Sequence, residues 1–127
     1  ICRDFDVESG LALNSKSELK LENGFAAFTK DFFDNGAYVI ENNQTHEVSL
    51  RDPEGKNYLN VYFPEAPLFG LLSAEKKNAP YAAIEPWFGR CDKEDFNGSL
   101  EEREWGHVLA QGACFQAAYT IEIAGED

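Results

Sequence analysis

One carboxylate stands alone in an apolar and aromatic stretch of the sequence. Glu85 lies in the run PYAAIEPWFGR, residues 80–90, between Ile84 and Pro86. Apolar flanks would desolvate its carboxylate and increase its affinity for a proton, which favours a general base. The ordinary alternative is a carboxylate at a strand end, neutralised by Arg90 or by a lysine. Glu85 is therefore the first candidate for a catalytic group.

An aromatic pair, Trp87 and Phe88, follows closely after Glu85. Such rings offer a large, flat apolar surface on which the face of a sugar could lie. Packing in the protein core is the alternative for the same two residues. We take Trp87 as a candidate substrate-binding residue beside Glu85.

The histidines and one acidic loop give no complete catalytic or metal-binding pattern. His46 suits a surface position and His107 suits a strand end, and two histidines alone form neither a Ser-His-Asp set nor an HxxxH metal pair. Residues 93–104 approach the spacing of an EF-hand calcium loop. The first ligand position, however, holds Lys93, a cation where a carboxylate is required. We predict no metal site.

The elements that must position these residues are predicted to be β-strands. Turn signals, notably Asn23-Gly24 and Asp52-Pro53-Glu54-Gly55, separate short β-branched, aromatic or alternating runs. Pro86 excludes its own run from the middle of a sheet. The fold is predicted to be all-β, a sandwich or barrel. Its strands are expected at residues 37–41, 47–51, 58–63, 81–88 and 115–123, and residues 25–33 are expected to be helical or irregular.

The composition is that of one globular domain with an acidic surface. The 127 residues are 43% hydrophobic and 13% aromatic, a length and composition that suit a single packed core. The net charge of −12 argues against nucleic acid and anionic membrane as partners and suits a neutral small molecule. Cys2, Cys91 and Cys114 form no CxxC motif, so we expect reduced thiols in a cytoplasmic protein.

Several segments together carry a resemblance to a known family. They are the IEPWFG core at residues 84–89, an acidic loop at 92–98, the turn Arg103-Glu104-Trp105-Gly106 and a final strand at 117–123, preceded by FFDNGAYVI at 32–40. With these features the chain, from about Leu19 to Ile123, resembles the C-terminal part of the aldose 1-epimerase (galactose mutarotase) family, and its LacX-like branch most closely.

The resemblance implies a fold and an activity. Residues 1–127 would be the C-terminal part of a single galactose mutarotase-like domain, an antiparallel β-supersandwich. Its enzymes are isomerases of carbohydrate metabolism that interconvert the α and β anomers of a free aldose, here an aldohexose. A glutamate base takes the proton of the C1 hydroxyl and a histidine acid protonates the ring oxygen, so no cofactor is needed.

The resemblance also assigns residues. Glu85 takes the place of the base, and Asn35 and Trp87 are expected to bind substrate. Neither His46 nor His107 occupies the place of the acid, so we expect that histidine in the remaining N-terminal part of the same fold. An exposed apolar edge is expected where those strands belong. The alternatives are a non-catalytic carbohydrate-binding β-sandwich and a purely structural β-domain.

Overall fold

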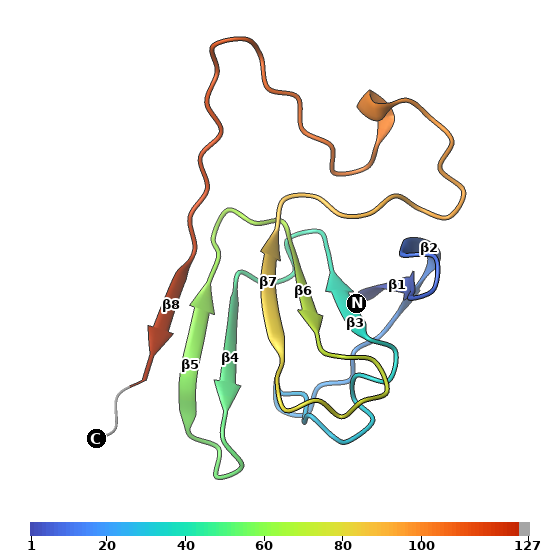
Figure 1. Ribbon diagram of the computed structural model, residues 1–127. Helices are drawn as coiled ribbons and strands as arrows, with labels where there is room; N and C mark the ends of the chain where they lie inside the picture. The colour runs from blue at the N-terminus through green and yellow to red at the C-terminus, as the bar shows by residue number, and fades with distance from the viewer. Residues whose placement is uncertain (125–127) are drawn as a thin grey trace.

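The computed structural model describes residues 1–124 as two antiparallel β-sheets. The larger sheet has the strand order β2-β1-β3-β6-β7 and the smaller one the order β4-β5-β8 (Figure 1). The elements are β1 (Cys2–Asp6), β2 (Leu11–Ser17), β3 (Ala37–Ile40), β4 (Glu47–Arg51), β5 (Asn57–Tyr62), β6 (Leu68–Leu72), β7 (Ala83–Trp87), the 3₁₀-helix η1 (Leu100–Glu102) and β8 (Thr120–Ile123).

The all-β prediction is confirmed for these residues, which contain no α-helix. Strands β3, β4 and β5 lie within one residue of the predicted runs, and a turn from Asp52 to Gly55 joins β4 to β5, with the Gly55 N–H donating to the Asp52 carbonyl at 3.0 Å. Strand β7, which contains Pro86, is the last strand of its sheet and not a central one, as predicted, and Pro86 pairs with Phe69 inside the strand without a bulge. Proline is tolerated there because an edge strand has one side without ladder bonds.

The two ends of the chain differ from the prediction. Strands β1 and β2 were not expected, because their sequences CRDFD and LALNSKS are rich in polar residues. Residues 25–33 contain no helix and are irregular, which was one of the two expectations, with turns at residues 30–33. The last strand covers only residues 120–123 of the predicted run 115–123, and all four of its residues are exposed. Residues 115–119 form no strand and are exposed, and within them Phe115 packs against the ring of Phe88 at 5.2 Å.

The core joins the two sheets. Val61 lies near the end of β5 and Phe63 directly follows it, and Phe63 is completely buried. They pack with Ile40, Phe69 and Leu71 of the larger sheet, and the rings of Phe63 and Phe69 lie 5.4 Å apart. Alternation along β6 places Phe69 and Leu71 on this inner face and their neighbours on the other face. The inner face of the larger sheet is therefore the face that the smaller sheet covers.

The predicted free cysteines are found as thiols. Cys2 is buried, Cys91 is half-buried and Cys114 is exposed, and all three are unpaired. Burial raises the pKa of the Cys2 and Cys91 thiols. No helix among residues 1–124 is long and apolar enough to cross a membrane.

Candidate functional site

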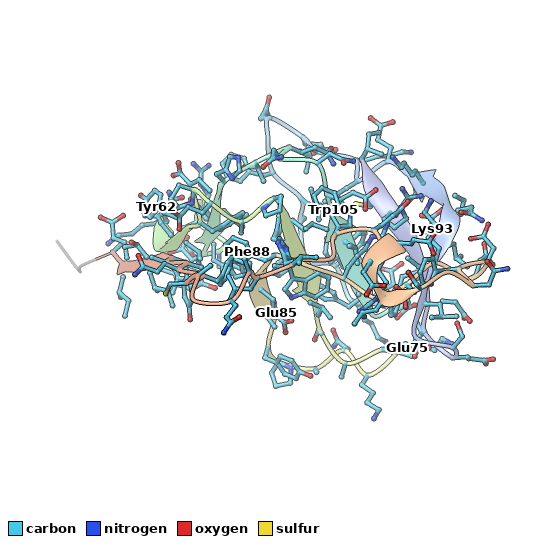
Figure 2. All side chains as sticks on the ribbon, turned by 90° about the horizontal axis from the view of Figure 1, so that it is seen from above. Tyr62, Glu75, Glu85, Phe88, Lys93 and Trp105 are labelled. Atoms are coloured by element: carbon cyan, nitrogen blue, oxygen red, sulfur yellow. The ribbon has the colours of Figure 1, made fainter. Side chains whose placement is uncertain are left out.

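Glu85 lies in the middle of β7 and is exposed to solvent (Figure 2). Its neighbour Ile84 faces the core and packs on it. Because successive side chains of a strand point to opposite faces, the apolar neighbours of Glu85 in sequence do not surround it in space. The predicted desolvation of the Glu85 carboxylate is therefore wrong for the described structure. Its neutralisation by Arg90 is wrong as well, because Arg90 pairs with other carboxylates.

Trp87 lies two residues further along β7, on the same face as Glu85. Its indole Nε1 donates a hydrogen bond to Oε2 of Glu85 at 3.2 Å. No other described residue hydrogen-bonds the Glu85 carboxylate, so Oε1 is open to a ligand. Trp87 is thus the residue that holds the candidate base, and only the remainder of its ring is left to contact a substrate.

Gly70 makes this position of the indole possible. It pairs directly with Glu85 in the register of β6 and β7. A Cβ atom on Gly70 would lie 2.6 Å from Cζ2 and 2.8 Å from Cη2 of Trp87, and 2.7 Å from Cδ1 of Leu72. The indole therefore lies across the bare backbone of Gly70. The sequence analysis did not single out Gly70, although a glycine inside the apolar run LFGLL is typical of such a close approach.

Asn35, the second predicted substrate-binding residue, lies in a different place. It is exposed in the turn before β3 and lines a hollow of about 340 Å³ together with Asp34, Tyr38 and Glu75. Glu85 and Trp87 do not line this hollow. The structure therefore does not bring Asn35 together with the other two predicted site residues in one cavity.

A second hollow, of about 380 Å³, has an aromatic lining. Phe28, Tyr58 and Tyr81 contribute partly exposed rings to it, and Lys30 and Asn78 contribute polar groups. Aromatic rings with a few polar groups between them are the usual lining of small-molecule sites. This hollow was not predicted from the sequence, because its residues come from separate loops and strands.

The two histidines make backbone contacts. Nδ1 of His46 lies 3.2 Å from the carbonyl oxygen of Phe63. Nε2 of His107 contacts the carbonyl oxygen of Phe88, one residue beyond β7. Neither imidazole hydrogen-bonds Glu85 in the described structure.

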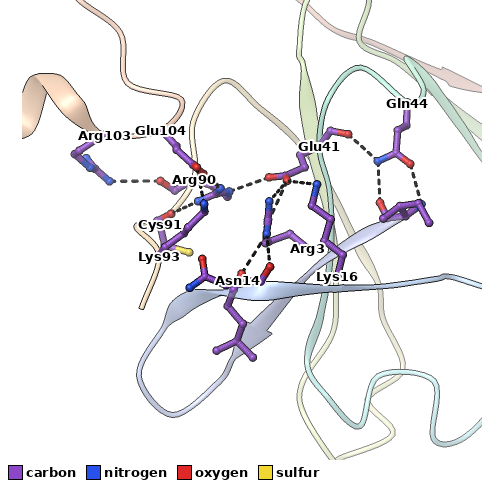
Figure 3. Close-up of polar contacts among 12 residues, drawn as sticks. Arg3, Asn14, Lys16, Glu41, Gln44, Arg90, Cys91, Lys93, Arg103 and Glu104 are labelled. Atoms are coloured by element: carbon purple, nitrogen blue, oxygen red, sulfur yellow. Dashed lines mark hydrogen bonds and ion pairs between the residues drawn. The ribbon is translucent and has the colours of Figure 1, made fainter. Parts of the chain in front are cut away.

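A buried ionic network ties the N-terminal strand to the segment after β7 (Figure 3). Nε and Nη2 of Arg3 donate to Oε1 of Glu41 at 3.1 and 2.7 Å. Nε of Arg90 donates to the other oxygen, Oε2, at 3.0 Å. Glu41 is thus held between two guanidinium groups. In the described residues no buried side-chain nitrogen or oxygen lacks a hydrogen-bond partner, so this network is complete without a ligand.

The positive charges of the network lower the pKa values of its carboxylates. Burial opposes the ionisation of Glu41, but hydrogen bonds from Arg3 and Arg90 and their positive charges outweigh it and lower the pKa of Glu41. A hydrogen bond from Lys93 is the main cause that lowers the pKa of Glu104, and Arg90 adds to it. Both carboxylates are therefore ionised at neutral pH.

The same network also joins the first and the twelfth positions of the calcium-loop-like residues 93–104. Nζ of Lys93 pairs with Oε1 of Glu104 at 2.7 Å, and these are the first and the twelfth positions of the motif. The Lys93 ammonium group thus lies beside Glu104, where a calcium ion would have to bind. Over residues 1–124 no group of three or more His, Cys, Asp or Glu side chains is placed to hold a metal.

Known proteins give no further guide to the site. No protein-family model, no curated protein and no solved structure matches this chain.

Proposed function

We propose that this chain belongs to an aldose 1-epimerase-like enzyme, with Glu85 as its base. The observation that carries the proposal is the state of the Glu85 carboxylate: it is exposed on a strand, Trp87 holds one oxygen, and the other oxygen is open. A general base needs this combination of fixed orientation and access to a substrate proton. The resemblance of residues 84–89 to the family supports the same assignment.

In the proposed reaction a free aldohexose binds with its C1 hydroxyl at Oε1 of Glu85. Glu85 takes the hydroxyl proton while an acid protonates the ring oxygen, and the bond between C1 and the ring oxygen breaks. Rotation about the C1–C2 bond turns the other face of the aldehyde towards the ring oxygen. The reverse proton transfers then close the ring as the other anomer, so no proton is lost or gained overall and no cofactor enters.

The proposed reaction also needs a residue that orients the base and an acid that protonates the ring oxygen. Trp87 orients Glu85 and borders the sugar. Asn35 lines a separate hollow, so this proposal gives it no contact with a sugar bound at Glu85. The acid is a histidine in the remaining N-terminal part of the same fold, since neither His46 nor His107 hydrogen-bonds Glu85. The protein acts in the cytoplasm, in keeping with its acidic composition and free thiols.

Polarimetry on the full-length protein tests the assignment of the base. A freshly dissolved α-anomer of an aldohexose should change rotation faster with the protein than without it. Glu85→Gln should lower this rate by about 10²–10⁴-fold, the usual contribution of a general base. Glu47→Gln, an exposed glutamate of β4, is the matched control and should leave the rate unchanged. An unchanged rate in Glu85→Gln would refute the role of Glu85.

A second function, carbohydrate binding without catalysis, is favoured by the aromatic hollow. A sugar face could lie on Tyr58 or Tyr81, which are 48% and 58% exposed. In that case sugars would bind without anomer interconversion, and Tyr81→Ala would abolish binding while Glu85→Gln would not. Calorimetric titration with common aldoses separates the two functions. A flat response to all of them would leave a purely structural domain.

A further inference from the structure

The aromatic hollow lies between three separate parts of the chain. The segment 28–34 forms one wall, the loop 73–82 between β6 and β7 forms another, and Leu50 and Tyr58 of the β4–β5 hairpin complete it. Its volume of about 380 Å³ is at the lower end of the range for small-molecule sites, about 300–1,000 Å³. The hollow therefore suits a ligand of the size of one ring with a short polar group.

Hydrogen bonds hold two of these walls in place. The Ser73 N–H donates to the Gly36 carbonyl at 3.2 Å, and the Ser73 hydroxyl donates to the Tyr81 carbonyl at 2.7 Å. The loop is thus tied to the turn before β3 and closed on itself. Within it, Lys76 and Asn78 have φ angles of 50° and 43°, a left-handed conformation that is uncommon outside glycine. Strained backbone of this kind is often found at ligand sites.

Three rings give the hollow an apolar lining. Phe28 packs against Phe32 and Phe33, with ring centroids 5.0 and 5.2 Å away, so these contacts fix its orientation. It is nevertheless 47% exposed, and Tyr58 and Tyr81 from the other two walls are exposed as well. Each of these rings offers a flat apolar surface against which another ring can pack.

Two unpaired charges of opposite sign line the same hollow. Lys30 and Asp34 belong to its lining, and neither forms an ion pair within residues 1–124. The third charged residue of the lining, Lys76, is already paired, with Nζ 3.0 Å from Oε1 of Glu75. Because Lys30 and Asp34 do not pair with each other, a ligand that carries one group of each sign can pair with both.

We propose that the aromatic hollow binds an aromatic α-amino acid as its zwitterion. Lys30 pairs with the ligand carboxylate, Asp34 pairs with the ligand ammonium group, and the ligand ring packs on Phe28 and Tyr81. A neutral sugar, the occupant in the second proposed function, would leave both charges without a counter-charge. The site is also separate from the proposed base, because Glu85 does not line the hollow.

Calorimetric titration of the protein with three related compounds tests the proposal. L-Phenylalanine carries both charges, phenylpropionate lacks the ammonium group, and phenethylamine lacks the carboxylate. Phenylalanine should bind about tenfold or more tightly than either analogue, because each analogue leaves one charged hydrogen bond unmade. Added salt should weaken the binding of phenylalanine.

Variants that remove one charge identify the residue that contacts each group. Lys30→Gln should weaken phenylalanine binding by about tenfold, to the level of phenethylamine, and leave the binding of phenethylamine itself unchanged. Asp34→Asn should weaken it to the level of phenylpropionate, whose own binding should stay the same. Lys20→Gln, at an exposed lysine outside the hollow, is the control and should change none of the three affinities. Circular dichroism checks that the variants remain folded.

Three results would each overturn the proposal: no binding of phenylalanine, equal binding of phenylalanine and its two analogues, or charge variants that weaken all three compounds alike. Glucose in the same titration separates this proposal from the second proposed function, because saturation by glucose without binding of phenylalanine would assign the hollow to carbohydrate. No outcome depends on anomer interconversion, so failure of the catalytic assignment of Glu85 remains a separate result.

Discussion

The indole of Trp87 lies across the backbone of Gly70, on the neighbouring strand. A Cβ at Gly70 would come within 2.6 Å of the ring, and the ring in turn donates its N–H to Glu85. The orientation of the candidate base therefore depends on a residue that has no side chain. Any side chain at position 70 would have to displace the indole or move β6 away from β7.

Gly70→Ala should destabilise the protein by about 1–3 kcal/mol, the usual result of overpacking. Urea unfolding followed by circular dichroism measures the loss. In a Trp87→Ala background the same substitution should be less destabilising, because part of the clash is gone; the contact of Leu72 with the new methyl group would remain. Equal losses in both backgrounds would show that Gly70 and Trp87 are not coupled.

Glu41→Gln should destabilise the protein by about 3–5 kcal/mol, because it removes the carboxylate that pairs with buried Arg3 and one of the two that pair with buried Arg90. Urea unfolding at neutral pH measures this loss. Arg51→Gln is the control, since Arg51 is exposed and hydrogen-bonds only a neutral side chain, Asn57. A loss no larger than that of the control would contradict a stabilising role for the network.

The pH dependence of stability follows from the same carboxylate. The pKa of Glu41 is lower in the folded protein than in the unfolded chain. Its contribution is therefore fully present above the unfolded value, about 4.3, and is lost as the pH falls through the folded value. Unfolding free energies measured from neutral to acid pH should drop less steeply below about pH 4 in Glu41→Gln than in the wild type. Identical slopes would show that Glu41 does not titrate in this way.

Calcium should leave the protein unchanged. The Lys93 ammonium group already pairs with Glu104, so a calcium ion would have to displace the lysine side chain. Thermal unfolding with calcium should match that with magnesium, which controls for general screening of the acidic surface. A calcium-specific rise in the melting temperature would contradict the assigned ion pair.

The cysteines should react in the order of their exposure. Cys114 is exposed, and Cys2 is 2% exposed with a raised pKa. A maleimide should therefore modify Cys114 first, then Cys91, and Cys2 only as the protein unfolds. Mass spectrometry of partly labelled samples gives the order. Early labelling of Cys2 would mean that β1 leaves the sheet easily.

The sequence was sufficient where local pattern decides the structure. β-Branched and alternating residues identified β3, β4 and β5, and Pro86 identified the edge position of β7. It was insufficient for β1, because Arg3 is buried through its pairing with Glu41, thirty-eight residues away. Periodicity carries no information about a polar residue that becomes buried through a distant partner.

The candidate site could also be predicted from the sequence only in part. The residue type and spacing of Glu85 and Trp87 could be recognised in the sequence, and their hydrogen bond follows from two residues on one face of a strand. The exposure of Glu85 could not be predicted, because sequence neighbours of a strand residue lie on the opposite face. The role of Gly70 depends on the register between β6 and β7, which only the assembled sheet reveals.

The ionic network has a consequence for folding kinetics. Glu41 meets Arg3 and Arg90 from thirty-eight and forty-nine residues away, so these contacts form only after β1, β3 and the segment beyond β7 have come together. Interactions that are absent from the transition state slow unfolding without speeding folding. Loss of Glu41 would then speed unfolding, and so shorten the lifetime of the folded chain, while the folding rate would stay almost unchanged.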